Sequence, residues 1–508
     1  MVKAVILGLI AASLSTAWPT DVHAATVTAA TCSLTDVAAA VGRASNGDTV
    51  QIAAGRCSWT STLSISKGIS LIGAGIDQTI IEDNVPRTSP SFGIVIDVST
   101  ARGADWRLSG FTVTYGSVAE IGGQGAIRLG GASHAFRIDH VKLDNTVHYH
   151  LISTYGDLWG VIDHCQFNTS RNSVGIHIRH DQWGGVGAYG DNSWATPTNL
   201  GSEQFIFVED NIGTSIGAVQ DLIDGTHGSR YVARYNTTVN MPIGGGHGTD
   251  SGGRFRGVRA FEIYNNTMST TSLFGVASYL RSGTGVIYNN KLTNFQYAVT
   301  GQNFRDIDAF APWGAADGSS RFDVNTGVIY ASGTHTGANG VALILSDSTK
   351  AWSSSQWVGY SVRNITQGWG TAVASNTATS IAAYQSNYGQ TRTWNTGDAY
   401  QILKSTAALD QVGRGAGNLV SGDAPTPAAW PNQAAEPVYV WNNAGYLLTE
   451  ASGRWNSVQG GRDIIVAPKD YQSFPYPHPL VSGSAVPVSG STAPSTAPVP
   501  PPSNLTVK

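Results

Sequence analysis

Residues 136–164 read FRIDHVKLDNTVHYHLISTYGDLWGVIDH, and within them an apolar pattern ending in Ile-Asp-His occurs twice, 24 residues apart. Related segments end at Asp210, Asn236, Asn265 and Asn289, after further spacings of 46, 26, 29 and 24 residues. A repeat of this length is typical of a solenoid whose strands stack about 4.8 Å from those of the neighbouring coils. The 46-residue interval then marks one coil that carries a long loop.

The last residues of these segments predict a column at one corner of the solenoid. Stacked asparagine side chains hydrogen-bond to one another and to the turn backbone, so we interpret the column as a structural ladder. A functional role for the column is the alternative. Its members are His140, His164, Asp210, Asn236, Asn265 and Asn289.

The N-terminal region indicates how the solenoid begins. Residues 31–55, CSLTDVAAAVGRASNGDTVQIAAGR, contain a helix capped by Ser33, a turn and an alternating strand, and ISLIGAG follows at 69–75. These motifs resemble the first coils of proteins of the pectate-lyase-like superfamily. The resemblance covers about 25–315 and 436–482. It implies an all-β fold, a right-handed parallel β-helix solenoid with an N-terminal capping helix near residues 33–44.

The remaining segments differ in composition and in period. The start of the chain has a lysine, an apolar run and a small-residue cleavage site, so we expect a signal peptide and a secreted protein, extracellular or periplasmic. Strand-like runs after residue 316 lose the coil spacing and predict an inserted small β domain. The predicted organisation is signal peptide 1–24, β-helix 25–316, insert 317–405, linker and final coils 406–482, and a disordered Pro/Ser-rich tail 483–508.

Composition narrows the class of partner. Only 13% of the residues are charged and the formal net charge is −4, which favours neither nucleic acid nor an anionic membrane. No apolar run after the signal peptide is long enough for a membrane span. We expect a monomer without nucleic-acid partners or membrane insertion. Cys32 and Cys57 are candidates for a disulfide, and Cys165 is expected to be buried and free.

The insert is rich in tryptophan, which allows two interpretations. The rings either fill the core of a small β domain, which we favour, or form a face that stacks on sugars. The residues concerned are Trp352, Trp357, Trp369 and Trp394.

Histidine and arginine are concentrated in one part of the chain. Nine of the 12 histidines fall between His134 and His247, and five arginines fall between Arg230 and Arg259. Residues 244–257, GGGHGTDSGGRFRG, set four ionisable side chains among glycines. Arginine suits bidentate recognition of carboxylates, and glycine suits close approach of a bulky ligand. The alternative is that the arginines form salt bridges that fix long loops and that the glycines make turns.

Strand parity predicts which of these side chains face outward. If Phe261 and Ile263 fill the core, then Arg254, Arg256 and Glu262 face outward. Segments one coil apart, at 224–230, 244–259 and 279–281, would then form a single patch. The loop at 180–194 falls in the 46-residue interval, and we expect it to wall a binding groove.

The resemblance implies an enzyme that acts on acidic polysaccharides. Lyases of this superfamily remove the proton on the carbon next to a uronate carboxylate. That proton becomes acidic only when the carboxylate charge is neutralised. We predict a polysaccharide lyase with a histidine base, an arginine on the carboxylate and Tyr279 as acid. The catalytic candidates are His227, His247, Arg254, Arg256 and Tyr279. The substrate-binding candidates are Arg230, Arg259, Arg281, His180, Trp183 and Tyr189.

Metal dependence and two other functions stay open. Asp224 and Asp250 are candidate calcium ligands, although the aspartate run of pectate lyases is missing. His148 and His150 have metal-ligand spacing, but we discount a zinc site because no carboxylate cluster accompanies them. One alternative is a glycoside hydrolase that uses Asp224 and Asp250 as its paired carboxylates. The other is a non-catalytic carbohydrate-binding adhesin of the tail-spike kind.

Overall fold

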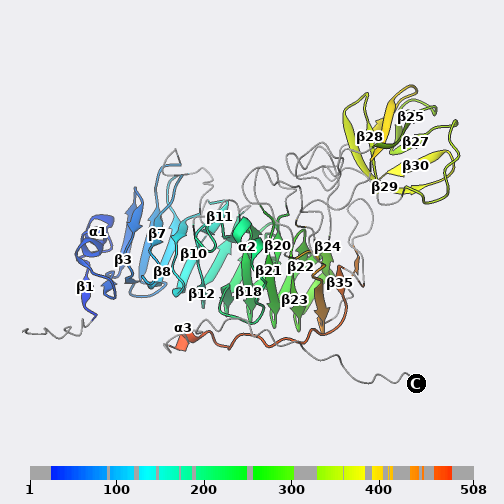
Figure 1. Cartoon of the computed structure of the whole chain (residues 1–508). Helices are drawn as coiled ribbons and strands as arrows, with labels where there is room; N and C mark the ends of the chain where they lie inside the picture. The colour runs from blue at the N-terminus through cyan, green and yellow to red at the C-terminus, as the bar shows by residue number, and fades with distance from the viewer. Residues whose placement is uncertain are drawn as a thin grey trace, which may run out of the picture.

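The structure is a computed structural model of the whole chain. It describes residues 24–87, 92–118, 125–144, 148–170, 173–185, 190–248, 256–301, 329–357, 360–383, 392–403, 410, 412–415, 435–444, 449–450, 461 and 463–482. Among these residues, strands are far more common than helices, and most strands are paired in parallel (Figure 1). No helix in the described ranges is long and apolar enough to cross a bilayer.

The largest sheet has 20 strands, which form two rows that share β8 and β10. Row one consists of β1 (Thr26–Thr28), β2 (Thr49–Gln51), β5 (Ser70–Ile72), β8 (Trp106–Tyr115), β10 (Phe136–Asp144), β12 (Gly160–Asp163), β15 (Ile206–Glu209), β18 (Arg230–Arg234), β21 (Ala260–Tyr264), β23 (Thr284–Tyr288), β33 (Val438–Trp441) and β35 (Ile464–Ile465). Row two adds β3 (Gly55–Trp59), β6 (Thr79–Asp83), β13 (Gln166–Thr169), β16 (Ile212–Ser215), β19 (Thr237–Val239), β22 (Thr267–Leu280), β24 (Lys291–Gly301) and β34 (Thr449–Glu450).

A second parallel sheet of seven strands forms row three. Its strands are β4 (Leu63–Ile65), β7 (Ile96–Thr100), β9 (Ile127–Gly131), β11 (His150–Thr154), β14 (Val174–Arg179), β17 (Ile223–Thr226) and β20 (Gly245–Gly246). The chain visits the rows in turn: β11 lies in row three, β12 in row one, β13 in row two and β14 again in row three. The inward-facing apolar side chains of all three rows share one core, which includes Phe261 and Ile263 as expected from the sequence.

The predicted corner column is present, but with a different composition. Glu209 pairs with Arg234 in the register of β15 and β18. The next residues, Asp210 and Tyr235, therefore align, and Asn236 lies one position further on. His140, His164, Asp210, Tyr235, Asn265, Asn289 and Asn442 all have positive φ, which asparagine and aspartate tolerate well.

The asparagine ladder is one residue further along the chain. Asn211 Nδ2 donates to Asn236 Oδ1 at 3.0 Å, Asn236 Nδ2 to Asn266 Oδ1 at 2.9 Å, and Asn266 Nδ2 to Asn290 Oδ1 at 3.0 Å. Asn290 continues it to Asn443. The bonds join successive row-one corners and satisfy buried polar groups, so the ladder is structural, as interpreted from the sequence.

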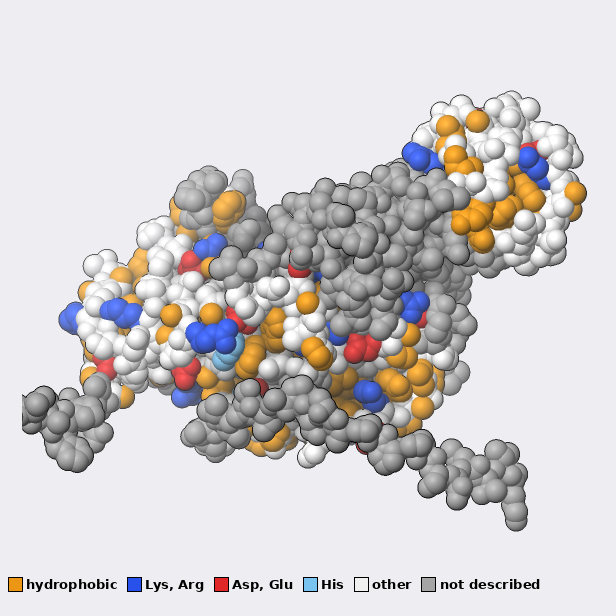
Figure 2. Space-filling model, viewed as in Figure 1, with side chains coloured by type: hydrophobic (Ala, Val, Ile, Leu, Met, Phe, Trp, Pro, Cys, Tyr) orange, Lys and Arg blue, Asp and Glu red, His pale blue; other side chains and the backbone are white. Residues whose placement is uncertain are grey.

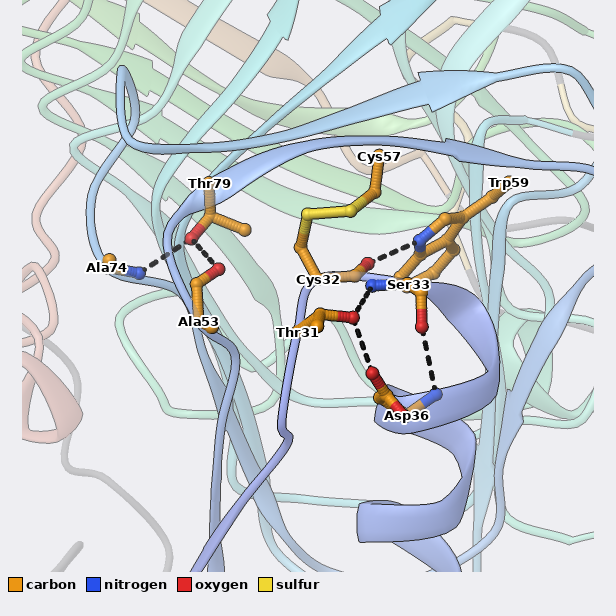
Figure 3. The surroundings of a disulfide bond; sticks show 9 residues. All are labelled: Thr31, Cys32, Ser33, Asp36, Ala53, Cys57, Trp59, Ala74 and Thr79. Atoms are coloured by element: carbon orange, nitrogen blue, oxygen red, sulfur yellow. Dashed lines mark hydrogen bonds between the residues drawn. A yellow bond between two sulfur atoms is a disulfide. The ribbon is translucent and has the colours of Figure 1, made fainter.

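A short helix and a disulfide close the N-terminal end. Helix α1 (Leu34–Arg43) begins where Ser33 accepts a hydrogen bond from the Asp36 amide, and it buries Val37, Ala40 and Val41. Cys32 and Cys57 form a disulfide, and Trp59 Nε1 donates to the Cys32 carbonyl at 3.0 Å (Figure 3). Cys165 is buried and free, as expected. Helix and disulfide together cover the end of the core.

The described residues between 329 and 403 form antiparallel sheets with a core of their own. Trp357, Trp369 and Trp394 are buried there and Trp352 packs against them, so these rings fill a core and present no sugar-stacking face. In Figure 2 the hydrophobic side chains gather visibly on this unit, while charged side chains on the same view are sparse. Its separability as a domain stays a prediction. Its strands are β25 (Ile329–Thr334), β26 (Val341–Ala342), β27 (Ile344–Ser346), β28 (Ser361–Asn364), β29 (Trp369–Asn376), β30 (Ser380–Ala383), β31 (Thr393–Trp394) and β32 (Ala399–Leu403).

The C-terminal segment 463–482 runs back along the outer face of row one and ends in helix α3 (Pro479–Ser482) (Figure 1). Phe474 and Leu480 pack there against Phe207 and its neighbours. Arg234 donates to the carbonyls of Phe474 and Pro475 and pairs with Glu209. The outer face of row one is therefore covered in this region, whereas rows two and three are not covered by this segment.

Candidate functional site

A cluster of histidines lies on the outward face of row three. We call it the histidine cluster; its members are His150, His177, His227 and His247. The register places His177 beside Asp224, and Asp224 beside Gly245. Ile176, Ile178 and Ile223 alternate with these polar residues and enter the core. His247 directly follows β20, and its amide donates to the Gly225 carbonyl. Strand alternation therefore brings side chains distant in sequence together on one surface.

His247 and Asp224 form the central pair of this surface. His247 Nδ1 lies 2.6 Å from Asp224 Oδ1, and the His247 side chain is 33% exposed against 8% for Asp224. Burial alone would raise the pKa of Asp224, but its ion pair and hydrogen bond with His247 hold that pKa below its usual range. An ionised carboxylate at Nδ1 orients the imidazole and leaves Nε2 for chemistry.

Two further histidines extend the pair along row three. His150 and His177 stack with ring centroids 4.1 Å apart, and His150 Nε2 lies 3.9 Å from Asp224 Oδ2. His177 Nε2 is 3.0 Å from Thr226 Oγ1. Burial and the neighbouring His150 keep the pKa of His177 well below its usual range, so this imidazole is neutral at pH 7.

His227 lies in the same surface but faces a different set of groups. Its Nδ1 is 2.7 Å from Thr226 Oγ1, and its Nε2 lies 3.4 Å from Arg179 and 3.6 Å from Asp181. Burial and the Arg179 charge lower the pKa of His227 to about 2, while burial raises the pKa of Asp181 to about 6. His227 is thus neutral and engaged at both nitrogens, which makes it a weaker base candidate than His247.

Tyrosine and arginine side chains border the cluster. Tyr149 is 47% exposed and its ring packs edge-on against His150 at 4.7 Å. Partial burial and the charges of Asp224 and Asp221 raise the pKa of Tyr149, so its hydroxyl stays protonated. Arg281 Nε donates to the Gly246 carbonyl at 3.2 Å, and its guanidinium lies 6.0 Å from the centre of the Tyr279 ring. Tyr149 thus borders His150, and Arg281, with Tyr279 beside it, contacts the backbone just before His247.

Three of the predicted arginines, Arg230, Arg256 and Arg259, are structural, which corrects the sequence interpretation for them. Arg256 is fully buried and makes two 2.6 Å bonds to Asp410 and one of 3.1 Å to Asp191. Arg230 is buried and donates to carbonyls of residues 193–198. Arg259 is buried against Glu436 and the Thr196 carbonyl. These arginines fix the segment that includes helix α2 (Asp191–Ala195), as the loop-fixing alternative expects.

The predicted groove wall is corrected for the same reason. His180 is fully buried; its Nε2 binds the Leu158 carbonyl at 3.0 Å and its Nδ1 accepts from the Arg230 amide at 3.1 Å. Trp183 is 5% exposed, packs against the Arg230 guanidinium and donates to Thr196. Neither side chain is accessible to a polysaccharide. Tyr189, Asp250 and Arg254 lie outside the described residues.

The glycines around His247 are needed for packing. A Cβ on Gly244, whose φ is +95°, would lie 2.5 Å from Ile263 Cδ1, and one on Gly246 would lie 2.9 Å from Val258 Cγ2. These glycines thus let the chain pass close to the core. They do not clear space for a ligand, which corrects that part of the sequence interpretation.

The calcium hypothesis does not fit the donors that surround Asp224. Calcium takes six to eight oxygen ligands, whereas the ion-pair partners of Asp224 in the described part of the chain are His150 and His247. The partners of Asp224 therefore do not favour calcium, while Asp250, the other candidate ligand, lies outside the described residues.

Sequence reasoning missed Tyr149, His177 and Arg179, and it discounted His150. Their signal was the apolar alternation of VGIHIR at 174–179, which places His177 and Arg179 on the polar face of a strand. The His148–His150 pair is divided: His148 is buried and bound to Asp83 at 2.9 Å, whereas His150 joins the cluster.

Comparisons with known proteins add little. No family model matches the chain, and no curated protein sequence matches it. A crystal structure of an alginate lyase from Paenibacillus sp. str. FPU-7 is similar over 54% of this chain and 99% of that chain, with 15% identity and a TM-score of 0.30. A likeness this weak carries no argument about fold or function.

Proposed function

We propose that this chain is a secreted, monomeric polysaccharide lyase that cleaves a uronate-containing polysaccharide by β-elimination. The observation that carries the proposal is the His247–Asp224 pair, at 2.6 Å, on an outward face bordered by Arg281 and two tyrosines. For the fold we propose a right-handed parallel β-helix. The 24-residue spacing and the three parallel rows visited in turn support it.

The proposed reaction begins at His247. Its Nε2 takes the proton from C5 of the uronate, and the electrons of the C5–H bond form the C4–C5 double bond. Asp224 keeps the imidazole oriented and stabilises the imidazolium that forms, as a buried carboxylate does for other histidine bases. The pairing of Nδ1 with Asp224 supports Nε2 as the basic nitrogen.

Neutralisation of the uronate carboxylate makes the C5 proton acidic. Arg281 is the proposed partner of that carboxylate, because its guanidinium lies beside His247 through the bond to Gly246. Arg179 is held by Asp181 at 2.6 Å and would contact a neighbouring sugar. An arginine fork suits the planar carboxylate better than a point charge.

The leaving oxygen at C4 requires a proton when the glycosidic bond breaks. Tyr149 is the proposed donor, because it is exposed, next to His150 and protonated at neutral pH. Tyr279, the candidate from the sequence, lies under Arg281 and is the second choice. Either phenol would act as a general acid opposite the histidine base.

A glycoside hydrolase is the second candidate, and the pair Asp221 and Asp224 favours it. Burial and the neighbouring Asp224 raise the pKa of Asp221 to about 7, whereas the pKa of Asp224 is lowered. One protonated and one ionised carboxyl is the arrangement of an acid and a base in glycosidases. That chemistry does not require an acidic sugar, so it would need no arginine beside the pair.

A product assay on purified full-length protein separates the possibilities. Pectin, alginate, hyaluronan and chondroitin are incubated with the protein, and both ultraviolet absorbance of unsaturated uronate and new reducing ends are followed. The lyase proposal expects both signals on at least one polymer. Reducing ends without absorbance indicate the hydrolase, and binding with neither product indicates an adhesin. His247→Ala is the inactive control and His164→Ala the matched control outside the cluster.

A further inference from the structure

We propose that His150, His177 and Asp224 form a binding site for a divalent transition metal ion of the zinc class. One ligand atom from each residue lies within 4.8 Å of the others. The three side chains come from neighbouring strands of row three, β11, β14 and β17, so the rigid sheet sets their spacing. The site shares Asp224 with the proposed lyase site, but its test does not rest on the proposed function, because metal binding requires no substrate.

The donor set selects the kind of metal. Two imidazoles and one carboxylate match zinc and its neighbours cobalt and nickel, whereas calcium and magnesium prefer oxygen ligands alone. Tetrahedral ligands 2.1 Å from a zinc ion are roughly 3.4 Å apart. His150 Nε2 and Asp224 Oδ2 are 3.9 Å apart. Small side-chain rotations would shorten this distance to the value that zinc requires. A three-residue set leaves one position open.

Hydrogen bonds around the three residues already orient the donors. Asp224 Oδ1 is bound by His247 Nδ1 at 2.6 Å, which leaves Oδ2 toward His150. The Thr226 hydroxyl lies 3.0 Å from His177 Nε2 and fixes that ring. Outer partners of this kind hold ligands in metal sites and raise their affinity.

A second histidine stack shows what distinguishes this cluster. His140 and His164 also stack, at 5.3 Å, and each binds the adjacent aspartate, Asp139 or Asp163, at 2.8 Å. Those carboxylates are already paired with Arg107 and Arg137. The Asp224 carboxylate is paired with histidines instead, whose rings can themselves serve as metal ligands.

The test measures metal binding without any activity assay. Full-length protein is stripped with a chelator, dialysed and titrated with Zn²⁺ by calorimetry, and Co²⁺ absorption reports on ligand geometry. We expect one Zn²⁺ per chain and tetrahedral Co²⁺ bands. His177→Ala should weaken Zn²⁺ binding by roughly a hundredfold, since loss of an outer partner alone costs ten- to a hundredfold. His150→Ala should weaken it similarly, and circular dichroism checks that both variants fold.

The control is His164→Ala, which removes a stacked histidine beside a carboxylate outside the site. It should bind Zn²⁺ as the parent protein does. The proposal is wrong if the parent protein takes up no stoichiometric Zn²⁺, or if His177→Ala and His164→Ala bind it equally well. Either result leaves the lyase assay unaffected, so the two proposals fail separately.

Discussion

The arginines around helix α2 and the histidines of row three come from the same short part of the chain, yet their surroundings are opposite. Arg230, Arg256 and Arg259 are fully buried, and each is bound by carboxylates or carbonyls. His247 keeps a third of its side chain exposed and, among the described residues, has one carboxylate partner. Charged residues that are concentrated in sequence thus indicate either a fixed loop or a binding site. Burial and complete pairing indicate the fixed loop, and partial exposure indicates the site.

The largest effect should follow from breaking the buried arginine network. Arg256→Met leaves Asp410 and Asp191 as buried carboxylates without their cation, and we expect a loss of about 3–5 kcal/mol in unfolding free energy. Urea unfolding followed by fluorescence measures it. Arg281→Met, at a partly exposed arginine, is the matched control and should cost under about 1 kcal/mol. Equal stability of the two variants would remove the distinction between the two regions.

The contribution of His227 to the free energy of unfolding should depend on pH between about pH 4 and 6, whereas the arginines keep their charge in that range. The folded pKa of His227 is about 2, whereas an unfolded histidine titrates near pH 6.5. Below pH 6.5 the unfolded state therefore binds a proton that the folded state refuses. Stability should fall by about 1.4 kcal/mol per pH unit for this group as the pH is lowered.

His227→Gln tests this pH dependence. Urea unfolding at each pH between 6 and 4 gives the slope of unfolding free energy against pH. In the variant this slope should be smaller by about 1.4 kcal/mol per pH unit, the contribution of one proton. The parent protein and Arg281→Met should keep the full slope. Identical slopes in His227→Gln and the parent would show that His227 is protonated in the folded protein.

The smallest predicted effect concerns the proposed carboxylate partner. Arg281→Lys keeps the charge but loses the planar fork, so kcat/KM on the cleaved uronate polymer should fall roughly tenfold, the scale of one charge-assisted hydrogen bond. Stability should change by less than about 0.5 kcal/mol, because the side chain is partly exposed. Unchanged kcat/KM with reduced stability would place Arg281 with the structural arginines.

Much of the arrangement of strands was predictable from spacing. The 24-residue interval between His140 and His164 is the register of β10 and β12, and the helix, its Ser33 cap and the buried core residues followed from local patterns. The asparagine ladder was misplaced by one residue, because matching by residue type aligned Asp210 with Asn236. The backbone needs positive φ at position 235, and there it accepts a tyrosine.

The proposed site was only partly predictable. His247, Asp224 and Arg281 were among the sequence candidates because their segments lie one coil apart. Tyr149 and His177 were missed because the long interval between coils hid the register of row three. The buried arginines were taken for site residues because parity shows only that a side chain leaves the core, and not whether a loop covers it. Asp410 lies 154 residues beyond Arg256, and sequence spacing gives no sign of that partner.

The most direct test of the account is the rate of unsaturated uronate formation by His247→Ala, on whichever polymer the parent protein cleaves. With folding verified by an unchanged urea midpoint, kcat should fall by roughly a hundredfold or more, the scale of a lost general base. His164→Ala should retain the parent rate. A His247→Ala protein that folds and forms unsaturated product at the parent rate would contradict the assignment of the row-three histidine cluster as the site of chemistry.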